Sequence, residues 1–273
     1  MTDRIFGILN ITGDSFSDAG KFLEPEAALA HAASLIADGA DVIDVGAASS
    51  NPRSEPVPPE MEIGRLAPVV LMAKERGWKL SIDSFASETQ LWAMGEGVEY
   101  LNDIQGFSDP SLYPYLASSN AKLIVMHAIQ GFGRAQKIDT VPLEIMGRIA
   151  DFFDARVDEL THAGIARHRL ILDPGMGLFV GSRPEVSLMV LRRLSQLKSA
   201  FGLPILVSVS RKSFLRKLVG RSIEQIGPAT LAAELYAALH GADMIRTHEP
   251  RPLRDSLRIW MQIAGAGAAM AGL

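Results

Sequence analysis

Three polar residues of the 273-residue chain stand at the ends of short apolar segments and form a carboxylate and amide set. Asp83 and Asp173 directly follow such segments, and Asn102 closes another. In a narrow pocket, these groups would accept from and donate to a flat heterocycle that carries several N–H groups. Because an unpaired buried polar group costs about 1–3 kcal/mol, the set predicts a polar ligand that satisfies it.

A second set of residues suits an anion such as phosphate. Arg246 and His248 flank Thr247, so on a strand both side chains face the same side. Arginine and histidine are suitable donors to phosphate oxygens. Asn10 follows the first apolar segment and offers an oxygen ligand for Mg²⁺, which prefers oxygen and keeps several waters.

A helix start supplies a further polar group. Lys212 and Ser213 open a predicted helix after the seventh apolar segment, and free N–H groups there attract a carboxylate or phosphate. Cysteine is absent and no Ser-His-Asp order is evident. The residues therefore predict positioning and charge stabilisation without a covalent intermediate.

The segments that must position these residues alternate in character along the chain. The predicted strands are Ile5–Leu9, Asp41–Val45, Lys79–Ile82, Tyr100–Asn102, Lys122–Met126, Leu170–Leu172, Ile205–Val209 and Met244–Ile245. The predicted helices between them include Pro25–Asp38, Glu60–Arg76, Glu88–Glu96, Pro142–Ala163, Glu185–Ala200 and Ala229–Leu239.

This alternation predicts a parallel α/β sheet. Eight βα units in about 270 residues fit a closed (β/α)₈ TIM barrel, formed as a single domain over residues 1–273. A doubly wound open sheet is the alternative, since the sequence does not show closure. In a barrel the polar groups after all eight strands, including Asp103 and His127, converge on one rim.

Each polar residue also has an ordinary structural interpretation. A single Asp or Asn after a strand is more often a helix cap or turn residue than a ligand. Pro174, Gly175 and Gly177 fit turn chemistry. His31, His162 and His240 lie in or at the ends of helical stretches and are expected at the surface. A functional site is favoured by the recurrence of polar residues after all eight apolar segments, and not by any single residue.

Composition narrows the classes of function. The chain has 27 basic and 31 acidic side chains, and a net charge of −4 argues against nucleic-acid binding. The absence of cysteine excludes disulfides and Cys-ligated metal centres and favours a cytoplasmic location. No apolar run approaches the about 20 residues of a membrane span, and the N-terminus lacks signal-peptide features. We expect small-molecule substrates and no membrane partner.

The motifs together resemble those of dihydropteroate synthases, which are pterin-binding (β/α)₈ enzymes. They are ILNITGDSFSDAG, SIDS, YLNDIQGF, MH, ILDPGMG, VSVSRKSFL and IRTHEP. The resemblance implies condensation of 6-hydroxymethyl-7,8-dihydropterin pyrophosphate with p-aminobenzoate, giving 7,8-dihydropteroate and pyrophosphate in folate biosynthesis. It also implies Mg²⁺ as cofactor and a homodimer formed through the outer helices.

The resemblance implies a role for each matching residue. The pterin site would be formed by Asp83, Asn102, Asp173 and Lys212. The pyrophosphate site, with Mg²⁺ at Asn10, would be formed by Asn10, Arg246, His248, Ser50 and Arg53. The p-aminobenzoate site would be formed by Ser213, Leu178, Phe179, Phe16 and Ser17. The catalytic residues would be Asp83, Asp173, Lys212 and Asp18, the last on a loop that closes over the site.

The expected reaction is dissociative. Pyrophosphate leaves readily once Mg²⁺, Arg246 and His248 spread its charge. The C–O bond breaks before attack, and the resulting cationic methylene is stabilised by anionic groups such as Asp83, Asp173 and Asp18. The neutral arylamine of p-aminobenzoate then attacks without needing a strong base.

The chain departs from the family pattern in loops near the p-aminobenzoate end. Gly13 replaces a proline, and Asn51 stands where the second loop usually has arginine, with Arg53 two places later. Leu178 and Phe179 add bulk to the sixth loop. These features are similar to the sulfonamide-insensitive synthases. Because sulfonamides extend beyond the outline of p-aminobenzoate, the added bulk predicts exclusion of the drug by steric clash.

Three other functions remain alternatives. A pterin-dependent methyltransferase domain shares the barrel and pterin residues but lacks the pyrophosphate set. A phosphate-binding aldolase or isomerase would need a Schiff-base lysine or a strand-end glutamate, and no such glutamate is evident. A non-catalytic pterin-binding protein would not need Asn10, Arg246 and His248.

Overall fold

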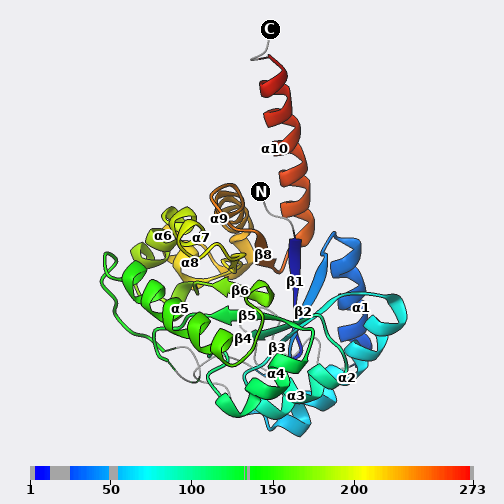
Figure 1. Cartoon of the computed structure of the whole chain (residues 1–273). Helices are drawn as coiled ribbons and strands as arrows, with labels where there is room; N and C mark the ends of the chain where they lie inside the picture. Colours follow the sequence, from blue (N-terminus) through cyan, green and yellow to red (C-terminus); the bar gives the residue numbers. More distant parts are fainter. Residues whose placement is uncertain (1–3, 13–24, 49–54, 132, 134–135, 271–273) are drawn as a thin grey trace.

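A computed structural model of the chain describes residues 4–12, 25–48, 55–131, 133 and 136–270. Its eight strands are parallel and form one sheet in the order β6-β5-β4-β3-β2-β1-β8-β7 (Figure 1). A parallel bridge between Leu172 and Ile205 joins β6 to the segment entering β7. The amide of Leu172 donates to the carbonyl of Pro204 at 2.9 Å. The sheet thus closes, which confirms the predicted (β/α)₈ barrel over the open alternative.

The elements follow the predicted order closely. The strands are β1 (Arg4–Asn10), β2 (Val42–Gly46), β3 (Leu80–Asp83), β4 (Tyr100–Asp103), β5 (Lys122–Met126), β6 (Leu170–Asp173), β7 (Leu206–Val207) and β8 (Met244–Thr247). The helices are α1 (Pro25–Ala37), α2 (Pro59–Arg76), α3 (Ser87–Gly95), α4 (Tyr113–Ser118), α5 (Ile145–His162), α6 (Pro184–Arg192), α7 (Leu194–Phe201), α8 (Ser213–Val219), α9 (Gly227–Leu239) and α10 (Pro250–Met270).

Two predicted elements differ from the observed ones. The predicted strand Ile205–Val209 contains only two residues in the β7 ladder. The predicted helix Glu185–Ala200 is two helices, because Arg193 leaves helical geometry with φ −114° and ψ 15°. Leu191 and Leu194 are buried on either side of this break, so the apolar spacing does not reveal it.

The interior of the barrel is built in layers, because side chains along a strand alternate between its two faces. A buried apolar layer is formed by Phe6, Val42, Tyr100, Ile124, Ile171, Leu206 and Met244. Residues two positions further along these strands point the same way. They include Asp44, Asn102, Met126, Asp173, Ser208 and Arg246. The apolar layer is therefore the floor beneath a polar layer.

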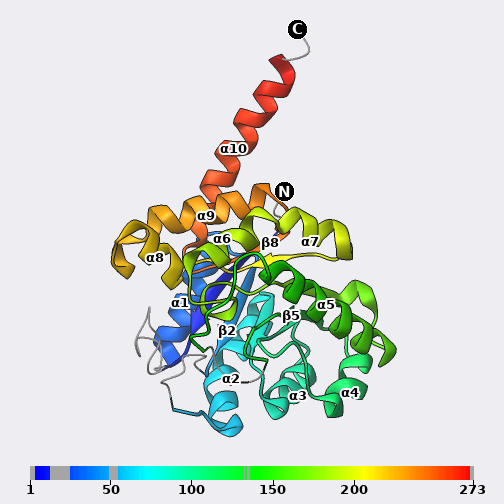
Figure 2. The same ribbon diagram turned by 90° about the vertical axis from the view of Figure 1, so that its left-hand side faces the viewer.

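The helices surround the barrel, and α10 projects from it well beyond the other elements (Figures 1 and 2). Leu253 and Leu257 of α10 are buried, whereas Ile259, Trp260 and Ile263 are exposed. In the part of the chain that the structure describes, no helix combines the length and the apolar character needed to span a membrane.

Candidate active site

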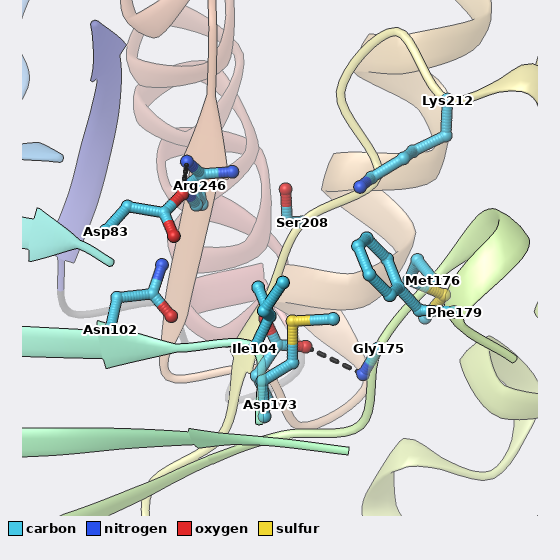
Figure 3. Close-up of a pocket in the computed structure, with 11 residues that line it drawn as sticks. Asp83, Asn102, Ile104, Asp173, Gly175, Met176, Phe179, Ser208, Lys212 and Arg246 are labelled. Atoms are coloured by element: carbon cyan, nitrogen blue, oxygen red, sulfur yellow. Dashed lines mark hydrogen bonds and ion pairs between the residues drawn. The ribbon is translucent and has the colours of Figure 1, made fainter. Parts of the chain in front are cut away.

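A pocket lies at the carboxyl ends of the strands (Figure 3). Most of its lining residues on the strands come two positions after residues of the apolar layer. It is lined by Asp83, Asn102, Ile104, Met126, Asp173, Gly175, Met176, Phe179, Ser208, Lys212 and Arg246. The structure thus brings together the four residues predicted to hold a pterin and one residue of the predicted pyrophosphate set.

Arg246 joins two carboxylates across the barrel. Its Nε forms an ion pair with Asp44 on β2, and its Nη2 lies 2.6 Å from Oδ2 of Asp83 on β3. Asn102 Nδ2 donates to Oδ1 of Asp44 at 3.5 Å. Asp44 is 0% exposed and is not one of the predicted site residues. A charged residue inside the apolar run VIDVG was the available signal, since a buried charge requires a partner.

Burial changes the acidity of the pocket carboxyls. It raises the pKa of Asp83 to about 7, against the opposing charge of Arg246. It raises the pKa of Asp173 to about 6, against a hydrogen bond from the backbone of Gly175 and the charge of Lys212. Burial disfavours the charged form of Arg246, but Asp44 and Asp83 outweigh it and raise its pKa. The guanidinium therefore stays charged, whereas the carboxyl groups of Asp83 and Asp173 have pKa values close to neutral pH.

Lys212 enters the pocket from the side opposite Asp83 and Asn102 (Figure 3). Its Nζ lies 5.1 Å from the centroid of the Phe179 ring, a cation–π distance. Burial and the nearby Arg246 lower the pKa of Lys212 to about 8, although Asp173 and Asp83 oppose the change.

Phe179 lies in the wall of this pocket, and Leu178 packs behind it without lining the pocket. Phe179 is buried in a small apolar cluster with Ile104, Met126 and Ala128, and Leu178 packs against that cluster. The two residues predicted to add bulk at the p-aminobenzoate end are thus next to each other, with the Phe179 ring beneath Lys212.

The turn after β6 fixes the carboxylate of Asp173. Its Oδ1 accepts from the amide of Gly175 at 2.8 Å. Gly175 has φ +74°, and a Cβ there would lie 2.4 Å from the carbonyl oxygen of His127, so only glycine fits. Nδ1 of His127 donates to the carbonyl of Pro174 at 3.2 Å, and burial lowers the pKa of His127 to about 4. Neutral His127 holds this turn and does not line the pocket.

Asp103 was expected at the rim, but it faces away from the pocket. Alternation along β4 places Asn102 inside the barrel and Asp103 behind it. Its carboxylate accepts from Gln90 Nε2 at 3.0 Å and from the amides of Gln105 at 2.7 Å and Phe107 at 3.1 Å. Phe107 has φ +59°, so Asp103 holds a strained turn that carries Ile104.

His248 follows β8 and contacts Ser210 of the loop after β7. Its amide donates to Ser210 Oγ at 3.1 Å, and its Nδ1 lies 2.9 Å from the same oxygen. Burial, and then the charges of Arg211 and Arg246, lower its pKa well below the usual value. His248 is therefore neutral at physiological pH.

The remaining predicted residues divide into two groups. Ser213 is the first residue of α8, and Asn10 ends β1 in register with Gly46 of β2. Both side chains are partly buried. The others, together with Gly13 and Asn51, lie outside the described residues. They are Phe16, Ser17, Asp18, Ser50 and Arg53.

The described residues fit Mg²⁺ only as a metal held largely by a substrate. Within the described ranges, no three His, Asp or Glu side chains are grouped to bind a metal. Asn10 lies four positions after Phe6, so it faces the barrel interior and offers one amide oxygen. Protein-bound Mg²⁺ commonly takes one or two protein oxygens together with substrate phosphates and water.

Comparison with known proteins identifies a common family. Residues 6–248 match the model of the pterin binding enzymes. The chain is 58% identical over 255 residues to dihydropteroate synthase type-2 of Escherichia coli, covering 93% of this chain and 94% of that protein.

Two solved structures share the fold. The dihydropteroate synthase of Xanthomonas albilineans with 4-aminobenzoic acid has a TM-score of 0.86 at 32% identity, covering 96% and 93% of the chains. That of Yersinia pestis in complex with a sulfonamide drug has a TM-score of 0.87 at 31% identity, covering 96% and 94%.

Proposed function

The chain belongs to the pterin-binding enzyme family as one of its dihydropteroate synthases, and we propose how its pocket carries out their reaction. The enzyme condenses 6-hydroxymethyl-7,8-dihydropterin pyrophosphate with p-aminobenzoate in folate biosynthesis. The observation that carries our assignment of residues is the convergence of Asp83, Asn102, Asp173 and Lys212 in one pocket.

The pocket suits the pterin ring in polarity. Asp83, Asn102 and Asp173 offer acceptors to the N–H groups of the pterin, and Asn102 also offers a donor. Asp83 now pairs with Arg246, so we propose that the pterin replaces this contact while Asp44 keeps the guanidinium in place.

The leaving group is proposed to lie above the pterin, towards Asn10, Arg246 and His248. Arg246 and His248 donate to diphosphate oxygens and spread the charge that develops as the C–O bond breaks. Mg²⁺ held by Asn10 and the diphosphate would supply further neutralisation of that charge. Asp83 and Asp173 then lie close enough to the pterin to stabilise the cationic methylene before the arylamine attacks.

Turnover with both substrates tests the assignment directly. We expect dihydropteroate and pyrophosphate to form together, and pyrophosphate to be released from the pterin substrate in single-turnover experiments before p-aminobenzoate is added. Absence of any pyrophosphate release until p-aminobenzoate arrives would exclude the dissociative order. Pterin binding without turnover would favour a non-catalytic pterin-binding protein.

We propose that reduced sulfonamide binding is caused by Phe179, which lines the pocket, and by Leu178, which packs beside it. The support is that Phe179 is buried beneath Lys212 and Leu178 packs beside it, so neither can move away without disturbing the cluster. We expect Phe179→Ala to bind sulfamethoxazole more tightly relative to p-aminobenzoate, with Leu178→Ala as the matched comparison. Equal affinities of the unchanged enzyme for drug and substrate would contradict the proposal.

The remaining parts of the proposal concern the loops and the assembly. We assign Asp18 to loop closure, Phe16 and Ser17 with Ser213 to p-aminobenzoate, and Ser50 and Arg53 to the diphosphate. We also propose one cytoplasmic domain that forms a homodimer through its outer helices. Exposed apolar residues on α8 and α10, such as Leu218, Val219 and Trp260, support such an interface. Light scattering of the purified enzyme would distinguish dimer from monomer.

A further inference from the structure

A serine hydroxyl lies in the wall of the pocket without a hydrogen-bond partner. Ser208 directly follows β7, is 7% exposed and is one of the residues that line the pocket. Its Oγ is buried and has no partner among the described atoms. Because an unpaired buried polar group destabilises the folded state, a hydroxyl in this place points to a partner that enters the pocket.

The pairing of β7 with β8 fixes where this serine lies. Val207 pairs with Ile245, so Ser208 is the next residue in that register, beside Arg246. Leu206 belongs to the apolar layer inside the barrel, and Ser208 comes two positions later, on the same face of the chain. Figure 3 shows its side chain among the polar groups of the pocket.

Ser210, two residues further along, has partners within the protein. Its Oγ lies 3.1 Å from the amide nitrogen of His248 and 3.4 Å from Oγ1 of Thr247. Ser208 makes no such contact with the described atoms and faces the pocket instead. The two serines of the same segment therefore differ in that only Ser208 depends on a ligand to satisfy its hydroxyl.

The pocket has few side-chain donors that are free for a ligand. Asn102 Nδ2 donates to Asp44, and Arg246 donates to Asp44 and Asp83. Lys212 Nζ lies over an aromatic ring, and Ser208 Oγ is unpaired among the described atoms. A pterin carries acceptors, its carbonyl oxygen and ring nitrogens, as well as N–H groups. Carboxylates cannot donate to those acceptors, so the available donors must do so.

We propose that Ser208 is a further binding residue of this pocket, whose hydroxyl donates to an acceptor atom of the heterocycle. The inference deepens the proposed function and rests on it for the identity of that heterocycle. A hydroxyl hydrogen rotates about the C–O bond, so it can turn towards the acceptor that the ligand offers. A ring with no acceptor at this position leaves the hydroxyl unpaired and binds less tightly, so Ser208 contributes to the selection of the ligand.

Calorimetric titration of the full-length enzyme with 6-hydroxymethylpterin tests this role. Ser208→Ala removes the hydroxyl and keeps the Cβ, and we expect an affinity about 3- to 10-fold weaker, the equivalent of one hydrogen bond. Ser81→Ala is the matched control. Ser81 is 0% exposed and its Oγ is also unpaired among the described atoms, but it does not line the pocket. Ser81→Ala should bind the pterin as the unchanged enzyme does. An unchanged affinity in Ser208→Ala, or equal weakening in both variants, would overturn the proposal.

Urea unfolding separates a lost contact with the ligand from structural damage. Neither hydroxyl has a partner to lose, so both alanine variants should be at least as stable as the unchanged enzyme. Weaker pterin binding in Ser208→Ala together with lower stability would contradict a direct contact. If the unchanged enzyme and Ser208→Ala bind the pterin equally, only this inference fails. If the unchanged enzyme does not bind the pterin, the proposed function fails as well.

Discussion

Carboxyl groups on the two faces of the barrel strands have different kinds of partner. Inside, Asp44, Asp83 and Asp173 share the pocket layer with the cations Arg246 and Lys212. Cationic partners compensate buried carboxylates but can be exchanged, because a substrate with N–H groups offers the same carboxylate a replacement. The inner face is therefore arranged to bind.

Behind the strands, the direct hydrogen-bond partners of the carboxyls are neutral donors. Glu62 accepts from the hydroxyl of Thr89 at 2.8 Å, and Asp103 accepts from one side-chain and two backbone N–H groups. These donors belong to the fold itself and are not replaced when a ligand arrives. The outer carboxyls therefore hold loops and side chains, and the difference predicts which substitutions change stability and which change binding.

The largest effect is expected from removing the cation between the inner carboxyls. Arg246→Met leaves Asp44 without a cation in the barrel, which should lower the free energy of unfolding by about 3–5 kcal/mol. Urea unfolding measures this change. Arg251→Met, which removes an exposed ion pair with Asp38, is the control and should cost less than about 1 kcal/mol. A loss of stability no greater than that of the control would show that the ion pairs of Arg246 with Asp44 and Asp83 do not stabilise the barrel.

Loss of one inner carboxylate should act on binding. Asp83→Asn removes a charged acceptor for the pterin, worth about 1.5–3 kcal/mol, or about 10- to 150-fold in affinity. Calorimetric titration with the pterin pyrophosphate measures the change. The same substitution should leave urea stability nearly unchanged, since the amide keeps one acceptor for Arg246. If Asp83→Asn lowered the free energy of unfolding and left the affinity for the pterin pyrophosphate unchanged, the assignment of binding to the inner face would be contradicted.

Loss of an outer carboxylate should act on stability. Asp103→Asn turns an N–H₂ group towards N–H donors, which should cost about 1–3 kcal/mol in the free energy of unfolding. Pterin affinity should change much less than in Asp83→Asn. If Asp103→Asn instead weakened pterin binding as strongly with no loss of stability, the outer face would share the function of the inner one.

The smallest effect concerns pH. Burial raises the pKa of Asp103 to about 6, so between pH 4 and 6 the folded form binds more protons than the unfolded form. The stability from this group is complete below pH 4 and is lost as the pH rises through about 6. The slope is at most about 1.4 kcal/mol per pH unit. Urea unfolding at a series of pH values between 4 and 6 measures this. The free energy of unfolding should decline less with rising pH in Asp103→Asn than in the unchanged enzyme, and an equal decline in both would contradict the prediction.

Local patterns were sufficient for most of the fold. The apolar runs predicted all eight strands because both faces of each strand are buried. The break at Arg193 was missed because Leu191 and Leu194 continue the apolar spacing across it. The short β7 was not predictable, since its length depends on how its neighbours pair during closure of the barrel.

The pocket was predictable where a polar residue ends a strand, as with Asn102 and Asp173. Asp44 was missed because it lies inside an apolar run and its partner Arg246 is 202 positions away in the sequence. Asp103 was placed on the wrong side, because adjacent residues on a strand face opposite ways and the sequence does not show which one faces inward.

The most direct measurement is the affinity of 6-hydroxymethylpterin for two paired variants, Asp173→Asn inside the barrel and Asp103→Asn behind it. We predict saturable binding by the unchanged enzyme and by Asp103→Asn, and a loss of about tenfold or more in Asp173→Asn, whose carboxylate faces the pocket. Binding that is equally strong in both variants, or equally weakened, would contradict the assignment of the pterin to the inner carboxylates.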